Sequence, residues 1–419
     1  MPASLRSFVE ISPESHFSLQ NLPYGIFRPK DGAARPGVAI GGLVLDLAVL
    51  EERGHFRAPE FGGRAVFGGD SLNAFLALGR PAWRRTREIL QHLLAAETST
   101  LRDDGALRDR AFHRQDEVTM LLPARIGDYT DFYSSYHHAF NVGTMFRGPE
   151  NALMPNWKWL PIAYHGRASS IVPSGAEVQR PHGQIKPPDA EAPIFSASRA
   201  LDFELETAFF IGPPNKLGEP VPIAQAADHI FGIVLMNDWS ARDIQTWEYQ
   251  PLGPFLAKNF CTSISPWIVT LEALQPFRRP LPAQDPQPME YLRLAEDFTF
   301  DIQLEAQLQT AKMAGPQTIT RTNFQNLYWS MSQQLAHHTV GGCNLQPGDL
   351  LASGTISGPA EDGRGSMLEL TWRGANPLQM AGDETRKWLE NGDRLTISGW
   401  AQGDGYRVGF GEVTGQIVG

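Results

Sequence analysis

The 419-residue chain has few of the features that mark secreted or membrane proteins. Cysteine occurs only as Cys261 and Cys343, which excludes a disulfide framework or a zinc cluster and favours a reducing compartment. No apolar run approaches membrane-spanning length, and residues 1–25 lack the apolar core of a signal peptide. We therefore expect a cytoplasmic protein with no membrane-embedded segment.

An excess of basic charge is also absent. Lys and Arg number 36 against 46 Asp and Glu, a net charge of -10, and the basic residues are dispersed, so nucleic acid is not an expected partner. The chain has no G-x-S-x-G elbow, no G-x-G-x-x-G fingerprint after a strand and no P-loop. Serine-nucleophile and nucleotide-dependent chemistry are thus disfavoured.

What the sequence does contain favours a turn-rich, mainly β fold of the α+β class. Gly occurs 40 times and Pro 32 times, and the length favours two units over a single core. Short strands are expected in 17–50, a helix with its arginines in solvent in 71–98, and a charged connection in 102–117. The predicted domains are therefore 1–117 and 118–419, the second with brief helices near 225–230, 238–248 and 322–338.

An acidic strand is the strongest local signal. Residues 201–212 alternate polar and apolar side chains, as in a strand buried on one side, so Asp202, Glu204 and Glu206 share a face. Three carboxylates on one face repel each other unless a cation binds them. A divalent metal site and a solvent-exposed acidic face explain the pattern equally well.

The apolar strand 231–236 is followed by a second polar pattern. Asp238, Arg242, Gln245 and Tyr249 are spaced as one stripe of a helix. A helix that begins just after a buried strand often lines a ligand crevice. The alternative is an Asp238–Arg242 ion pair on a solvated helix, which an isolated instance favours.

Other candidate residues are isolated in the sequence. The aromatic-rich segment 126–148 contains Asp128 and Asp131 beside His137 and His138, and either histidine could be a general base or a structural residue. Three further positions have chemistry that needs a partner or a ligand: Lys258 in an apolar loop, Thr355 in a Gly-lined segment, and Glu369 on an expected strand. His337 and His338 precede Gly341-Gly342 and favour a helix terminus over a metal site.

Seven motifs resemble the fumarylacetoacetate hydrolase family, in the family's order and over nearly the whole chain. They are DYTDFYSS, MFRGPENALMPNW, YHGRASSIV, LDFELE, MNDWSARDIQTWEYQPLGPFLAK, SGTISGP and GSMLEL. The resemblance implies an SH3-like N-terminal barrel, a large C-terminal β-roll of mixed sheets and a homodimer. It also implies metal-assisted hydrolysis of the carbon–carbon bond of 4-fumarylacetoacetate, a small diketo acid, in the last step of tyrosine and phenylalanine catabolism.

The resemblance carries roles to individual residues. The implied ligands of Mg²⁺ or Ca²⁺ are Asp131, Glu204, Glu206 and Asp238. Lys258 and Thr262 are implied to lie close to the ion. The implied catalytic residues are His138, Glu369, Arg242, Gln245 and Lys258. The implied substrate-binding residues are Tyr133, Arg147, Tyr164, Arg242, Gln245, Tyr249 and Thr355.

Two departures from the family's pattern and two other functions stay open. His137 doubles the expected single histidine, and Cys261 stands where a glycine is expected near the metal. A related metal-dependent acylpyruvate hydrolase, hydratase or decarboxylase would use the same carboxylates with different loops. A non-catalytic, metal-stabilised binding protein would bind a ligand without turning it over.

Overall fold

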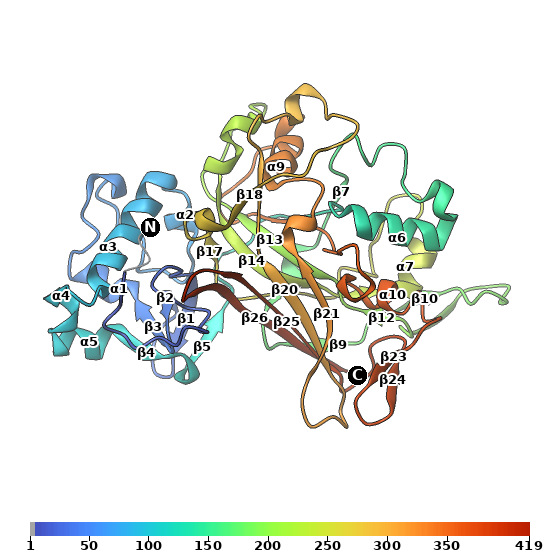
Figure 1. Ribbon diagram of the computed structural model, residues 1–419, viewed down its shortest axis with the longest axis horizontal. Coiled ribbons are helices and arrows are strands. Elements are labelled where there is room, and N and C mark those ends of the chain that lie inside the picture. The colour runs from blue at the N-terminus through green and yellow to red at the C-terminus, as the bar shows by residue number, and fades with distance from the viewer. Residues whose placement is uncertain (1–4) are drawn as a thin grey trace.

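The computed structural model describes residues 5–419 and is mainly β with short helices, as expected. A five-stranded antiparallel sheet with its helices lies on one side of the molecule (Figure 1). An eight-stranded sheet and a second five-stranded sheet, with several two-stranded ones, form the rest. No helix within the described part of the chain is long and apolar enough to cross a membrane. Both cysteines are free thiols.

The N-terminal sheet is antiparallel throughout, in the order β4-β3-β2-β1-β5. Its strands are β1 (Tyr24–Pro29), β2 (Arg35–Ile40), β3 (Leu43–Asp46), β4 (Phe112–Arg114) and β5 (Val118–Leu121). The strands expected in 17–50 are thus confirmed, and Gly41, with a φ of 54°, turns the chain from β2 into β3.

The charged segment 102–117 does not act as a simple connection. It contains α5 (Gly105–Ala111) and β4. Because β4 pairs with β3, most of the segment belongs to the N-terminal unit. β5 follows the expected boundary near Val118, yet it pairs with β1. The division into 1–117 and 118–419 stays a prediction, with β5 attached to the first unit by its hydrogen bonds.

The helix expected in 71–98 forms as two pieces, α2 (Asn73–Leu76) and α3 (Arg80–Leu94). Gly79 separates them with a φ of 83°, a conformation that glycine adopts without a steric penalty. Arg84 and Arg85 face solvent as predicted, but Arg87 is buried and donates to the backbone carbonyls of Gln20 and Asn21. The prediction of a fully solvated arginine face is therefore wrong at Arg87.

The central sheet of the larger unit is mixed and runs in the order β7-β6-β22-β13-β14-β16-β8, with β17 also paired to β14. Its strands are β6 (Tyr129–Phe132), β7 (Ala163–His165), β8 (Ile171–Pro173), β13 (Leu205–Ile211), β14 (Ile230–Asp238), β16 (Thr262–Ile264), β17 (Val269–Thr270) and β22 (Leu350–Ala352). β6 is parallel to β22 and β8 is parallel to β16, whereas the other pairs are antiparallel.

A second sheet, ordered β21-β20-β25-β26-β9, packs against the central one (Figure 1). Its strands are β9 (Glu177–Gln179), β20 (Gln303–Gln309), β21 (Gln317–Asn323), β25 (Arg394–Gln402) and β26 (Arg407–Val418). Phe209 of β13 lies in the core between these sheets, while Phe210 packs with Tyr24 and Phe75 of the N-terminal unit. Both faces of β13 are therefore buried, and the prediction of one-sided burial is wrong.

Of the helices near the expected positions, the first is shifted by two residues and the other two are shorter than predicted. A 3-10 helix spans Ile223–Asp228, α7 spans Arg242–Glu248 and α9 spans Met331–Val340. His337 and His338 lie in the last turn of α9, as expected, before Gly341. Asp238 is the last residue of β14 and not part of α7, so the four-residue helical stripe that begins at Asp238 does not form.

Candidate active site

Four buried carboxylates converge on the central sheet from β6, β13 and β14, with β22 between the first two of these strands. Asp131 is on β6, Glu206 on β13 and Asp238 at the end of β14, and Glu204 immediately precedes β13. One oxygen from each carboxylate lies within 4.8 Å of the others. The sequence thus placed Glu204 and Glu206 correctly as neighbours, and the fold brings Asp131 and Asp238 to them.

Three oxygens of this cluster have no hydrogen-bond partner. They are Oδ1 of Asp131 and both carboxylate oxygens of Glu206, all buried. Burial raises the pKa of Glu206 well above its ordinary value, and the neighbouring Asp131 raises it further. Burial and then Asp238 do the same to the pKa of Asp131. Unpaired, closely spaced carboxylate oxygens fit a hard divalent cation, which would supply the missing positive charge.

Lys258 partly compensates the cluster. Its Nζ contacts Glu204 and lies 2.7 Å from Oδ2 of Asp238. Burial alone would lower the pKa of Lys258, but Asp238 and Glu204 raise it, so the side chain is an ammonium. Thr262 donates to Oδ1 of Asp238 at 2.8 Å and Tyr164 donates to its Oδ2 at 3.0 Å. The lysine is therefore paired and buried, and it does not extend to the surface.

His138 and Glu369 form a second buried unit. Nδ1 of His138, on α6 (Tyr136–Arg147), lies 2.6 Å from Oε2 of Glu369. Ser357 and Ser366 donate to the same oxygen at 2.9 Å, and Asn141 donates to Oε1 at 2.9 Å. Burial would raise the pKa of Glu369, but His138, Asn141 and Ser357 lower it. The imidazole is thus oriented through Nδ1, which leaves Nε2 for chemistry.

Glu369 lies on a short helix and not on a strand, which corrects the sequence-based prediction. This helix, α10 (Met367–Leu370), begins after Ser366, whose side chain also accepts from the backbone N–H of Glu369. His137, the rival to His138, is half-buried and does not line the cavity described below. The structure therefore favours His138, whose Nδ1 is the nitrogen engaged by Glu369.

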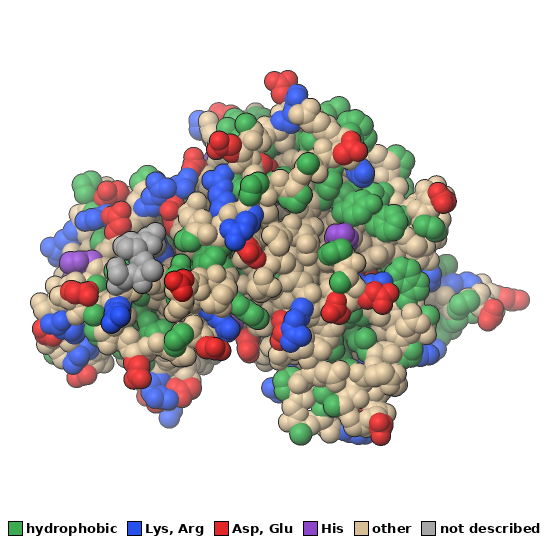
Figure 2. All heavy atoms as spheres, viewed as in Figure 1, with side chains coloured by type: hydrophobic (Ala, Val, Ile, Leu, Met, Phe, Trp, Pro, Cys, Tyr) green, Lys and Arg blue, Asp and Glu red, His purple; other side chains and the backbone are tan. Residues whose placement is uncertain are grey.

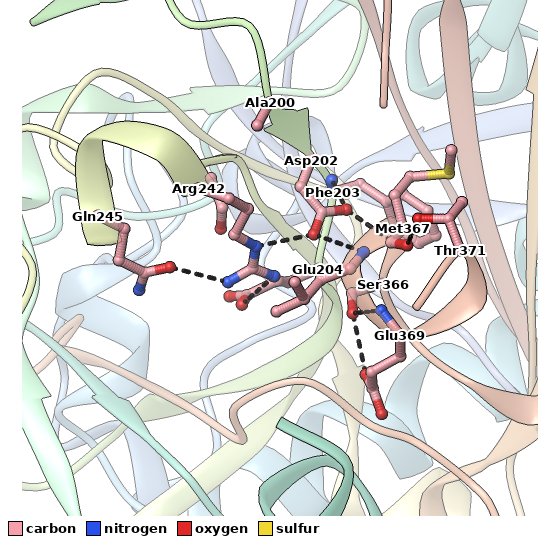
Figure 3. Close-up of polar contacts among 12 residues, drawn as sticks. Ala200, Asp202, Phe203, Glu204, Arg242, Gln245, Ser366, Met367, Glu369 and Thr371 are labelled. Atoms are coloured by element: carbon pink, nitrogen blue, oxygen red, sulfur yellow. Dashed lines mark hydrogen bonds and ion pairs between the residues drawn. The ribbon is translucent and has the colours of Figure 1, made fainter. Parts of the chain in front are cut away.

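Arg242 connects α7 to the acidic strand. Its Nε donates to Oδ2 of Asp202 at 2.8 Å, its Nη2 lies 2.8 Å from Oε1 of Glu204, and its Nη1 donates to Gln245 at 3.1 Å (Figure 3). The chain breaks its strand pattern between β12 (Leu201–Asp202) and β13, so Asp202 is turned to Arg242 and lies outside the four-carboxylate cluster. The expectation of three carboxylates on one strand face is wrong for Asp202.

These groups border one cavity of about 610 Å³. Of the predicted site residues, it is lined by Asp131, Tyr133, His138, Arg147, Tyr164, Glu204, Glu206, Arg242, Gln245, Tyr249, Lys258 and Thr355. Asp238 and Glu369 lie behind this lining and contact Lys258 and His138 of it, and Thr262 in turn donates to Asp238. The ring of Tyr133 meets that of His138 edge-on, with centroids 5.3 Å apart.

Sequence analysis missed several residues of the site. Asn141, Ser357 and Ser366 position Glu369, and Arg373 lines the cavity with its guanidinium 4.4 Å from the centre of the Phe146 ring. Ser357 and Ser366 fall within or beside the motifs SGTISGP and GSMLEL, where the Ser and Gly content was the only signal. Nothing in the spacing indicated that Arg373 would line the cavity.

The sequence matches known protein families in two parts of the chain. Residues 129–418 match the sequence model described as fumarylacetoacetate (FAA) hydrolase C-terminal, and residues 20–123 match fumarylacetoacetase N-terminal. Fumarylacetoacetase of Arabidopsis thaliana is 56% identical over 99% of both chains. Fumarylacetoacetase of Homo sapiens is 54% identical over 98% of both chains.

A solved structure supports the fold. A fumarylacetoacetate hydrolase from Exiguobacterium antarcticum has a TM-score of 0.53 at 18% identity, covering 94% of this chain and 99% of that one. At that identity the likeness concerns the fold alone, whereas the sequence matches cover the carboxylate cluster and the His138–Glu369 pair as well. The resemblance predicted from the motifs is confirmed: the chain belongs to the fumarylacetoacetate hydrolase family.

Proposed function

We propose that the chain is a hydrolase that cleaves 4-fumarylacetoacetate into fumarate and acetoacetate, the last step of tyrosine and phenylalanine catabolism. The observation that carries this proposal is one cavity bordered both by unpartnered, buried carboxylates and by a His138 oriented through Glu369. The relatives that are 54–56% identical over nearly the whole chain bear the name fumarylacetoacetase. Sites that combine charged partners with a base are commonly catalytic.

The metal would be held by the four-carboxylate cluster, with Lys258 and Thr262 beside it. The donors are oxygens, which Mg²⁺ and Ca²⁺ prefer, and the unpartnered oxygens of Asp131 and Glu206 support this assignment. When bound, the cation would supply Lewis-acid positive charge at the carboxylate end of the cavity. Asp238 is held in place for it by Thr262, Tyr164 and Lys258.

His138 acts as the general base in the proposed reaction. Its Nε2 takes a proton from a water molecule, and the resulting hydroxide attacks the carbonyl carbon at the fumaryl end of the bond. Glu369 holds the imidazole and stabilises the imidazolium that forms, as a carboxylate on the second nitrogen does in catalytic triads. The 2.6 Å contact between them supports this division of roles.

Collapse of the tetrahedral oxyanion breaks the carbon–carbon bond. The electron pair of that bond passes to acetoacetate as its enolate, and the enolate carbon recovers a proton from the imidazolium, so that fumarate and acetoacetate leave with one water consumed. Arg242, Gln245 and Lys258 are preorganised around the cavity where the negative charge develops. The charges of Arg242 and Lys258 act strongly because both side chains are buried and solvent screens them little.

The substrate is held by polar groups of an otherwise apolar cavity. We assign this role to Tyr133, Arg147, Tyr164, Tyr249 and Thr355, together with Arg242 and Gln245. All seven line the cavity, and Arg147 is fixed there by its hydrogen bonds to the carbonyls of Asn151 and Ala152, at 3.0 and 2.6 Å. A few convergent polar groups on apolar walls are typical of small-molecule sites.

The test is direct. The purified protein is mixed with 4-fumarylacetoacetate, and the loss of diketo-acid absorbance and the release of fumarate are followed with and without a chelator. We expect equal amounts of fumarate and acetoacetate, and loss of activity with the chelator. Faster turnover of an acylpyruvate would assign the chain to the related hydrolases, and binding without turnover would indicate a non-catalytic protein.

The remaining parts of the proposal concern assembly, the N-terminal unit and location. A homodimer is supported by exposed apolar side chains: Phe195 is 75% exposed and Leu252 is 96% exposed. Figure 2 shows hydrophobic groups along the projecting hairpin that contains Phe195. We further propose that the five-stranded antiparallel sheet is an SH3-like barrel and that the protein is cytoplasmic, where two free thiols persist. Light scattering of wild-type and Phe195→Ser protein tests the dimer.

A further inference from the structure

Asp202 is a fully buried carboxylate to which the proposed reaction gives no role. Its Oδ2 accepts from Arg242 Nε at 2.8 Å and from the backbone N–H of Leu368 at 3.0 Å. Its Oδ1 accepts from the backbone N–H of Met367 at 2.6 Å and from that of Phe203 at 2.8 Å. Each oxygen therefore has two donors, unlike the unpartnered oxygens of Glu206, so Asp202 is not a spare metal ligand.

The donors belong to the two halves of the proposed site. Arg242 stands on the side where negative charge develops and also contacts Glu204 and Gln245. Met367 and Leu368 are the first two residues of α10, and Glu369 is the next. Figure 3 shows Asp202 between the Arg242 guanidinium and the start of this helix. One carboxylate thus connects the oxyanion-stabilising arginine to the helix that carries the partner of His138.

We propose that Asp202 is a positioning residue that holds Arg242 and the Glu369–His138 pair in one fixed frame. The inference rests on the proposed function, because it concerns the same reaction. Bonds to a charged acceptor are short and directional, and four of them meet at this side chain. Catalytic groups need placement within about 0.5 Å, and a misplacement of about 1 Å costs on the order of 100-fold in rate.

Asp202→Asn tests the need for a carboxylate at this position. Since both oxygens accept two N–H groups, the amide nitrogen of Asn must face two donors in either orientation. We expect kcat for each folded site to fall by about 10- to 100-fold, because the placement of Arg242 relative to His138 shifts. KM is expected to change less than about 3-fold, because Tyr133, Arg147, Tyr164, Tyr249 and Thr355 still hold the substrate. Metal content is expected to equal that of the wild type.

Asp393→Asn is the matched control. Asp393 is 1% exposed and accepts from buried Arg386 at 2.9 and 3.0 Å, and neither residue lines the cavity. This variant loses the charge of an equally buried Asp–Arg pair and is expected to keep the wild-type kcat for each folded molecule. Equal kcat in Asp202→Asn and Asp393→Asn would overturn the proposal, because it would leave Asp202 with a structural role only.

Two further variants keep the test decisive if Asp202→Asn folds poorly. Asp202→Glu retains the charge that compensates Arg242 but adds one methylene, and we expect it to bind metal normally with kcat at least about 10-fold lower; an unchanged kcat would refute the positioning role. In a protein that already carries Glu369→Gln, either Asp202 variant is expected to lower kcat by less than about 3-fold further, because the two residues act as one unit. Fully multiplicative losses would show that they act separately.

The wild-type protein separates the two proposals. If it does not release fumarate from fumarylacetoacetate, the proposed function fails regardless of Asp202. If it does, and the Asp202 variants match Asp393→Asn in kcat, only the inference about Asp202 fails.

Discussion

Two buried glutamates of the cavity region have opposite surroundings. Neither carboxylate oxygen of Glu206 has a partner, and burial together with Asp131 raises its pKa well above the ordinary value. Glu369 is equally buried, but its oxygens contact His138, Asn141, Ser357 and Ser366, and its pKa is lowered. The same side chain at the same depth is therefore left unsatisfied in one place and fully satisfied in the other.

The difference teaches what each carboxylate is for. An unpaired buried charge destabilises the fold, and it is tolerated where an external cation completes the set. A carboxylate that accepts from donors on both oxygens, as Glu369 does, is suited to orienting a neighbouring imidazole. Unpartnered oxygens thus distinguish Glu206 and Asp131 as metal ligands, whereas Asp202 lies outside the four-carboxylate cluster with two donors on each oxygen and resembles Glu369.

The largest effect is expected from removing the general base that the fully hydrogen-bonded Glu369 orients. His138→Ala removes the group that takes the proton from water, and we expect kcat to fall by about 10²- to 10⁴-fold. Metal binding is expected to be unchanged, because His138 is not among the four clustered acids. Steady-state kinetics and metal analysis of the same sample check both statements. Substantial retained activity would refute the role of His138 as base.

Glu206→Gln changes the carboxylate whose oxygens have no partner. It is expected to lower the affinity for metal and to raise the stability of the metal-free protein. We expect metal affinity to fall by at least about 100-fold, because an anionic ligand is lost. In chelator-treated protein, the free energy of unfolding is expected to rise by about 1–3 kcal/mol, because a neutral amide replaces a buried acid whose charged form has no partner. Calorimetric titration and chemical denaturation measure the two quantities. A metal-free variant less stable than the wild type would contradict the assignment.

The contrast sharpens with pH. Burial, then neighbouring carboxylates, raise the pKa values of Asp131 and Glu206 above 3.8 and 4.5, so both groups hold protons in the folded, metal-free protein that the unfolded chain has lost. Their stabilising contribution is therefore present at low pH and is lost as the pH rises through the raised values. A bound metal must displace these protons.

We accordingly expect the Tm difference between metal-loaded and chelator-treated protein to widen as the pH is raised from about 5 to about 8. Calorimetric titrations in buffers of different ionisation enthalpy are expected to report proton release on metal binding. A pH-independent Tm difference without proton release would contradict the picture of an acid cluster that awaits a cation.

The smallest effect is expected at a partly exposed acid, Glu272. Glu272 accepts hydrogen bonds from Nε of both Arg80 and Arg84 at 2.9 Å. Partial burial raises the pKa of Glu272, but the two arginines outweigh that effect and lower it. Because the pKa is lowered, the contribution is present above 4.5 and is lost as the pH falls. Glu272→Gln is expected to cost only about 0.5–1 kcal/mol, with or without metal, since solvent screens the pairs. Thermal unfolding at two salt concentrations checks it, and a loss above about 2 kcal/mol would contradict this small value.

The sequence predicted those parts of the molecule that depend on local pattern. The hairpin strands before Asp46 and the neighbouring acids Glu204 and Glu206 follow from alternation and turn residues. The family motifs added Asp131 and Asp238, which come from strands far apart in the chain. Local reasoning failed at Asp202, because the strand is interrupted between β12 and β13 and the two-residue period no longer holds.

Tertiary contacts account for the other failures. Arg87 is buried because backbone carbonyls of Gln20 and Asn21 accept from its guanidinium, and no local pattern shows that. Glu369 was placed on a strand because its neighbours are apolar, yet Ser366 caps a helix there. The donors that satisfy Glu369 come from several segments, so its pairing could be expected on physical grounds but its partners beyond His138 could not.

The central claim is that a cation in the four-carboxylate cluster acts in the same cavity as His138. It is tested most directly by adding Mg²⁺ or Ca²⁺ stepwise to chelator-treated protein while bound metal and fumarylacetoacetate hydrolysis are measured on the same sample. We predict that activity rises in proportion to bound metal and saturates at one ion per chain, and that Glu206→Gln shifts both curves together. Full activity at less than about one tenth of an ion per chain would contradict the account.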